Sequence, residues 1–155
     1  MKKALSILLA ALMILSMAAC GDSKKDEEKA FDAKAAADAL LKEAEFSDCS
    51  FVESDQVELE YGITLEDTAE FYYARKDSNM SANMFLIAVA KDGKTSLMNG
   101  ELDKLVETYD KGWTELVYNA DEAAKVQSRF VEKKDGVYIC IISSDNDAMK
   151  TVIGK

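Results

Sequence analysis

The chain has 155 residues, of which 29 are acidic and 19 basic, and it contains neither histidine nor proline. Its formal net charge of −10 argues against nucleic acid as a partner, because clustered Lys and Arg side chains recruit the phosphate backbone. The absence of histidine excludes Ser-His-Asp and Cys-His catalytic groups as well as His-based zinc sites.

The first nineteen residues are typical of a secretory signal peptide. Lys2 and Lys3 form a basic head, an apolar run follows from residue 4 to residue 19, and small residues lead directly into Cys20. As a helix this run would span about 24 Å, less than the roughly 30 Å hydrocarbon core of a bilayer, so a cleaved signal is favoured over a transmembrane helix. The exit resembles the lipobox of bacterial lipoproteins, in which Met17 is a less usual residue. We therefore expect residues 1–19 to be removed and Cys20 to carry a diacylglyceryl thioether that anchors the protein to the membrane.

Residues 20–29 are predicted to comprise the lipidated cysteine and a polar, acidic tether. The stretch from Gly21 to Lys29 has no apolar residue to bury, although its charged run could instead extend an N-terminal helix. Residues 30–155 would then form a single domain. After cleavage, 17 basic residues oppose 29 acidic ones, and the resulting charge of −12 favours solubility and repels anionic lipid.

An amphipathic helix is predicted at the start of this domain, over Ala33–Glu45, with Asp32 as its N-cap. A short strand is possible at Val57–Leu59, and Tyr61-Gly62-Ile63 then turns the chain. The polar pair at the ends of Thr64–Asp67 resembles a capping box, which predicts a single helical turn there.

Two strands and the longest helix are predicted next. The strands are Glu70–Lys76 and Met84–Ala90, and the second is apolar on both faces, as in a central strand. The helix begins at residue 95 or 101 and continues to residue 118, because its apolar residues recur at helical spacing.

The C-terminal part is predicted to contain a helix from Asn119 to Val126, strands Arg129–Lys133 and Val137–Ile142, and a helix from Ser144 to Ile153. Asp135-Gly136 between the two strands is a preferred hairpin turn. Ser144 together with Asp147 is the expected cap of the last helix. The element order predicts an α+β fold, in which an antiparallel sheet of about four strands in ββα-ββα order carries helices packed on one face.

One set of features spans nearly the whole mature chain: Cys20 with its acidic tether, the Asp/Ala/Leu-rich first helix, Tyr61-Gly62-Ile63, the strand Met84–Ala90, the long helix, and the run from Gly136-Val137-Tyr138 to Ser143-Ser144-Asp145. Together they resemble the bacterial lipoprotein family of domain-of-unknown-function 4358. The resemblance implies an extracytoplasmic, lipid-tethered domain in a Gram-positive, anaerobe-type host. It implies no established activity and no catalytic residue. Cys49 and Cys140 are not expected as family features.

The two remaining cysteines leave their pairing open. An exported protein permits a disulfide between Cys49 and Cys140. The position of Cys140 in a predicted central strand favours packing as a small hydrophobic residue instead. A thiol nucleophile is disfavoured, since no histidine or surrounding motif supports one.

Two further groups suggest ligand sites but have simpler structural explanations. Asp145-Asn146-Asp147 is similar to the start of a calcium loop, yet Lys150 occupies the sixth position, where glycine is needed, and the chain ends before the twelfth. Helix capping is the favoured explanation. Tyr109 and Trp113 lie four residues apart and could stack on a ligand, but such a stripe more often packs in the core.

Four carboxylates lie close together in sequence, at Glu53, Asp55, Glu58 and Glu60. A pair of carboxyl groups about 5–10 Å apart across a cleft would allow glycosidase-like acid–base chemistry. A solvated strand face accounts for the same residues and is favoured.

The sequence thus predicts lipidation at Cys20 as the one assigned site, with no catalytic residue, metal ligand or cofactor. The leading hypothesis is a non-enzymatic, lipid-anchored binding or envelope-interaction domain at the extracytoplasmic face of the cell membrane, with an unknown protein or small-ligand partner. The first alternative is an ion or small-ligand sensor or carrier. The second alternative is a small carboxylate-dependent hydrolase.

Overall fold

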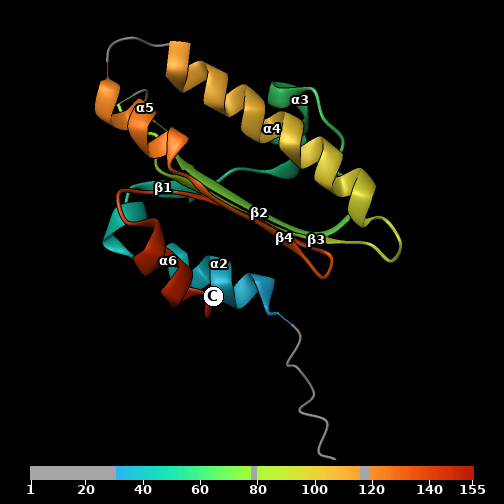
Figure 1. Cartoon of the computed structure of the whole chain (residues 1–155). Coiled ribbons are helices and arrows are strands. Elements are labelled where there is room, and N and C mark those ends of the chain that lie inside the picture. The colour runs from blue at the N-terminus through green and yellow to red at the C-terminus, as the bar shows by residue number, and fades with distance from the viewer. Residues whose placement is uncertain (1–30, 78–79, 116–118) are drawn as a thin grey trace, which may run out of the picture. The chain divides into compact units, whose positions relative to one another are not determined.

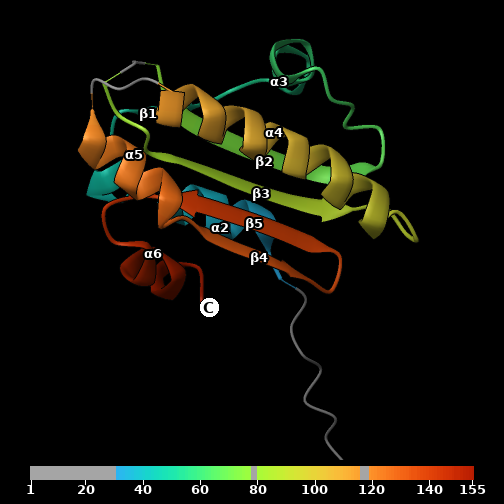
Figure 2. The same ribbon diagram turned by 45° about the horizontal axis from the view of Figure 1, so that its top comes forward.

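Five antiparallel strands form one sheet in the order β1-β2-β3-β5-β4 (Figures 1 and 2). This computed structural model describes residues 31–77, 80–115 and 119–155, so the predicted signal peptide, Cys20 and the tether lie outside the described residues. The predicted α+β class with an antiparallel sheet is confirmed. The strands are β1 (Cys49–Phe51), β2 (Thr68–Lys76), β3 (Met84–Ala90), β4 (Phe130–Lys134) and β5 (Val137–Ile142).

Helices cover both faces of this sheet, so the prediction of helices on one face is wrong. In Figures 1 and 2, α3, α4 and α5 lie on one side of the strands, and α2 and α6 lie on the other. No helix among the described residues is long and apolar enough to cross a membrane. The helices are α2 (Ala33–Leu40), the 3₁₀ turn η1 (Ala44–Phe46), α3 (Ser54–Tyr61), α4 (Thr95–Glu115), α5 (Ala120–Gln127) and α6 (Asn146–Val152).

The two central strands explain why both faces are covered. Successive side chains of a strand point to opposite faces. Accordingly, Leu86 and Cys140 belong to the core cluster under α4, whereas Phe85 and Ile139 belong to the cluster under α2 and α6. A sheet whose central strands are apolar at every position must be covered on both sides, because either bare face would leave its apolar side chains in water.

Several local signals in the sequence are confirmed by the structure. The side chain of Asp32 accepts a hydrogen bond from Ala35 N at 2.9 Å and caps α2. Asn119 accepts one from Glu122 N at 3.3 Å and caps α5. At the β4–β5 turn, Asp135 has φ 52° and Gly136 has φ 78°, the left-handed pair that a tight hairpin requires.

The region between α2 and β2 differs from prediction. α2 ends at Leu40, and a separate turn, η1, places Phe46 edge-to-face on Phe85 with ring centroids 5.3 Å apart. The strand β1 was not predicted, and it gives the sheet a fifth strand. Residues 57–59 form part of the helix α3, not a strand. Thr64–Asp67 forms no helix in the structure.

The short helix α3 has a local and a tertiary cause. Gly62 has φ 62° and ends the helix in the left-handed conformation, which glycine adopts without strain. Val57 is fully buried, whereas Leu59 is 87% exposed. A short strand was expected as a possibility at Val57–Leu59, but the segment is helical and only one of its two apolar side chains reaches the core.

Candidate functional site

The structure separates the two cysteines that it describes. Cys49 packs on the α2 side of the sheet and Cys140 on the α4 side, and both thiols are free. Cys140 is fully buried, which confirms its prediction as a small core residue. Burial raises the pKa of Cys49 to about 11 and that of Cys140 to about 12. Both thiols are therefore protonated near neutral pH and are poor nucleophiles.

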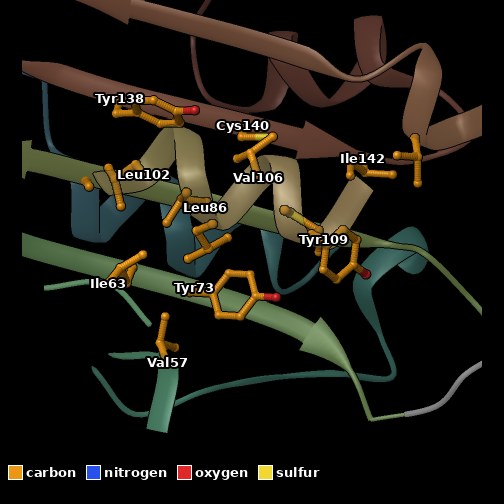
Figure 3. Packing of buried hydrophobic residues seen from close by; sticks show 14 of the residues in the cluster. Val57, Ile63, Tyr73, Leu86, Leu102, Val106, Tyr109, Tyr138, Cys140 and Ile142 are labelled. Atoms are coloured by element: carbon orange, nitrogen blue, oxygen red, sulfur yellow. The ribbon is translucent and has the colours of Figure 1, made fainter. Parts of the chain in front are cut away.

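Two other sequence-predicted groups have structural roles. Tyr109 and Trp113 are 8% and 9% exposed and pack against each other with centroids 6.3 Å apart, so their assignment to the core is confirmed (Figure 3 shows Tyr109). Asp145 caps α6 by accepting a hydrogen bond from Ala148 N at 2.9 Å, which confirms capping but places it one residue after the predicted Ser144. Across the described ranges, no three Cys, Asp or Glu residues are arranged to hold a metal ion.

The four carboxylates around α3 do not lie on a strand face, and two of them, Glu58 and Glu60, bind groups outside this helix. The Oε1 atom of Glu58 accepts a hydrogen bond from Leu65 N at 2.6 Å. Glu60 forms a bidentate pair with Arg75, at 2.5 Å to Nη1 and 2.7 Å to Nη2. Glu53 occupies the N-cap position, directly before the first residue of α3. The Glu60–Arg75 pair fixes the helix beside β2.

An aromatic group strengthens this attachment of α3 to the sheet. The Tyr61 and Tyr73 hydroxyls are 2.9 Å apart, and Arg75 Nη1 donates to the Tyr61 hydroxyl at 2.9 Å. Burial raises the pKa of Tyr73 well above its usual value, so its hydroxyl keeps its proton. The arrangement is rigid, because each polar group is held by a neighbour on the other element.

About half of β2 has no paired strand on its outer side among the described residues. β1 pairs with β2 only from Lys76 to Ala74, and Val52 N donates to the Tyr73 carbonyl at 2.9 Å. The chain then leaves the sheet to form α3, and no described strand pairs with residues 68–72 on this side. Backbone groups of alternate residues in a strand point the same way, so the N–H and C=O of Phe71 point outward, as the Tyr73 carbonyl does.

A hollow of about 380 Å³ lies beside this open strand edge. We call it the β2 groove. Leu65 and Phe71 give it an apolar part. Within the described part of the chain, its charged lining residues are Glu58 and Glu66, with no lysine or arginine. Its lining residues are Ser54, Glu58, Leu65, Glu66, Thr68, Ala69 and Phe71.

The loop between α3 and β2 forms one wall of the groove, and hydrogen bonds hold it from three sides. Besides the Glu58 contact, Thr64 N donates to Glu101 Oε2 of α4 at 3.1 Å. On the other side, Lys91 Nζ donates to the Glu66 carbonyl at 2.6 Å. The carboxylate of Glu66 itself is exposed to solvent. Of the groove residues, the sequence analysis named only Glu58, as one of four clustered carboxylates. The others were not predicted as part of a site, because no local motif marks a strand edge that lacks a paired strand.

A second polar cluster lies where η1, the β2–β3 connection, α5 and the end of β5 meet. Asn83 Nδ2 donates to the Glu45 carbonyl at 2.7 Å and to Glu45 Oε2 at 3.1 Å. Glu45 also accepts hydrogen bonds from the hydroxyl and the backbone N–H of Ser144. The hydrogen bond from the Ser144 hydroxyl is the largest cause of the lowered pKa of Glu45. Each member has a partner, which is the pattern of a structural network.

The same cluster continues into α5 through a largely buried ion pair. Lys125 Nζ lies 2.7 Å from Glu122 Oε1 and donates to Asn83 Oδ1 at 3.0 Å. Glu122 Oε2 accepts from Ala82 N at 2.6 Å, and Glu122 is only 8% exposed. The pair therefore connects α5 to the start of β3.

Replacing Lys125 with methionine should destabilise the protein by about 2 kcal/mol, because the buried Glu122 carboxylate would lose its cation. Urea unfolding followed by circular dichroism measures the change. Lys34→Met is the matched control, since it removes a lysine from an exposed pair with Asp38 at 2.6 Å and should produce no measurable change. Equal stability of the two variants would show that the Lys125 pair does not hold α5 in place.

The fold and the groove define a small α+β domain built on a five-stranded antiparallel sheet, with one strand edge partly open. The model of a family described as a domain of unknown function, DUF4358, matches residues 42–144, and the chain belongs to this family. The matched range includes β1 to β5 and every residue of the β2 groove. Neither the comparison with curated proteins nor that with solved structures finds a match.

Proposed function

We propose that the protein is a lipoprotein, anchored by acyl chains on Cys20, that presents a non-enzymatic binding domain at the extracytoplasmic face of a bacterial membrane. The predicted signal peptide and lipobox support the location. The β2 groove is the observation that carries the binding function, because an open strand edge beside a hollow is a surface on which an extended chain can dock.

The chemistry of the described residues favours binding over catalysis. Burial raises the pKa of the Cys49 and Cys140 thiols, which keeps both protonated at neutral pH. Of the carboxylates considered for acid–base chemistry, Glu60 is held by Arg75 and Glu58 by a backbone N–H. The Glu58 contact holds the loop wall of the groove and the Glu60 pair holds α3 beside β2, so both carboxylates already have a structural role.

Cross-linking on intact cells tests both parts of this proposal. A membrane-impermeant, amine-reactive cross-linker should modify the protein without lysis, because its domain lies outside the membrane and exposes lysines such as Lys34 and Lys104, which are 65% and 60% exposed. We expect a discrete adduct of higher mass, with a cytoplasmic protein left unmodified as the control. Modification only after lysis would contradict the location. Modification by the reagent without a cross-linked product of higher mass would contradict the binding function.

A further inference from the structure

The open part of β2 has the hydrogen-bonding pattern that an added strand needs. The outward N–H and C=O of Phe71 have no partner in any described segment, and Ala69 is a bulge residue with no partner in the β2–β3 register. Strand addition supplies affinity through such main-chain groups. By contrast, the opposite edge of the sheet, β4, carries Lys133 and Lys134, and edge lysines discourage strand pairing.

The β2 groove also provides a place for side chains of the added strand. Alternate side chains of a strand point to the same face, so every second residue of a docked segment would face the hollow. Leu65 is 9% exposed and Phe71 packs against the core, so both present rigid apolar surface. A small or medium apolar side chain would fit between them.

Charge indicates the rest of the occupant's chemistry. Glu58 and Glu66 are the charged residues among the described lining residues, and the Glu66 side chain is exposed at the rim. A segment with lysine or arginine at alternate positions would therefore be attracted to the rim. A second copy of this chain is a poor occupant, because pairing two β2 edges would bring two sets of these carboxylates together.

From these observations we propose that the β2 groove binds an extended, basic segment of a partner polypeptide as an additional antiparallel or parallel strand on β2. The proposal rests on the binding function proposed above and names its site and the chemical class of its ligand. Backbone pairing along residues 68–72 provides affinity. The acidic rim and the apolar hollow select alternating basic and small apolar side chains.

Binding of three labelled heptapeptides to the full-length protein in non-ionic detergent tests the proposal. The first probe alternates lysine and valine, the second alternates glutamate and valine, and the third is the lysine probe with its central valine replaced by proline. We expect saturable binding of the first probe by fluorescence anisotropy. The other two should bind at least about tenfold more weakly, because one is repelled and the other lacks a backbone N–H.

Two charge-reversal variants locate the binding. Glu66→Lys reverses an exposed rim charge and should weaken the lysine probe about three- to tenfold. Glu107→Lys makes the same change at an exposed position of α4 outside the groove and should leave binding unchanged. Hydrogen exchange provides a direct readout, since the amide of Phe71 should exchange at least about tenfold more slowly when the lysine probe is bound.

The outcomes separate this inference from the proposed function. Equal binding of the proline probe, equal weakening by both variants, or unchanged exchange at Phe71 would overturn strand addition at the β2 groove. Absence of binding by all probes would also overturn it. In each case an adduct on intact cells would still support a binding function located elsewhere, whereas absence of both the adduct and probe binding would reject the two together.

Discussion

Replacing Cys20 with serine should remove the mature form of the protein from washed membranes. Each acyl methylene buried in the bilayer contributes roughly 0.8 kcal/mol, and one myristoyl chain binds only marginally, so permanent attachment requires the two chains of a diacylglyceryl group. A serine at this position cannot form the thioether. We expect the membrane-bound mature form to fall by about tenfold or more, with the protein either released or left as the unprocessed precursor.

Fractionation followed by immunoblotting and mass spectrometry measures this effect. Mass spectrometry of the unaltered protein should find Cys20 as the first residue, with its acyl groups attached. Cys49→Ser is the matched control, since Cys49 is a half-buried thiol whose Sγ lies 3.5 Å from the Asn83 carbonyl, and the variant should stay on membranes. Mature-sized Cys20→Ser protein in washed membranes, at the level of the unaltered protein, would disprove acyl anchoring.

Replacing Leu102 with alanine should destabilise the domain by about 2–5 kcal/mol. Leu102 of α4 is fully buried over the sheet, in the core that contains Leu86 and Tyr138 (Figure 3). Its truncation removes apolar contacts and leaves a cavity that the surrounding strands cannot close. Because domains are stable by roughly 5–15 kcal/mol in total, this is a large fraction of the free energy of unfolding.

The control for this effect is another leucine to alanine change on a helix. Leu59 of α3 is 87% exposed, so Leu59→Ala should alter stability by less than about 0.5 kcal/mol. Urea denaturation of both variants, with unchanged slopes, measures the difference. A loss at Leu102 no larger than that at Leu59 would mean that α4 does not pack on the sheet as described.

The segment around α3 shows where sequence patterns mislead. Val57 and Leu59 alternate with glutamates, which indicated a strand, yet the structure forms a helix that buries only Val57. The local sequence pattern cannot reveal the Glu60–Arg75 pair or the Tyr61–Tyr73 contact. Both contacts hold this helix against β2. Such contacts join residues 12 to 15 positions apart and favour the helix over the strand.

The helices on both faces of the sheet, by contrast, follow from features of the sequence itself. Met84–Ala90 and Val137–Ile142 were both predicted to be apolar on both faces. Two such central strands require helices on both sides, whereas the predicted arrangement covered one. The structure resolves the difference by placing α2 and α6 on the second face.

Local chemistry was enough to predict the caps at Asp32 and Asn119, the Asp135-Gly136 turn and the central strands, because each depends on neighbours within a few residues. The signal peptide and the lipidation of Cys20 are likewise predictions from local sequence. Tertiary structure alone decided the rest. The path of the chain brings Glu45 to Ser144, 99 residues apart, and directs the chain after β1 into α3, so that part of β2 is left open. Such long-range contacts depend on which faces and edges of the elements pack together. The short-range periodicity of the sequence does not determine that packing.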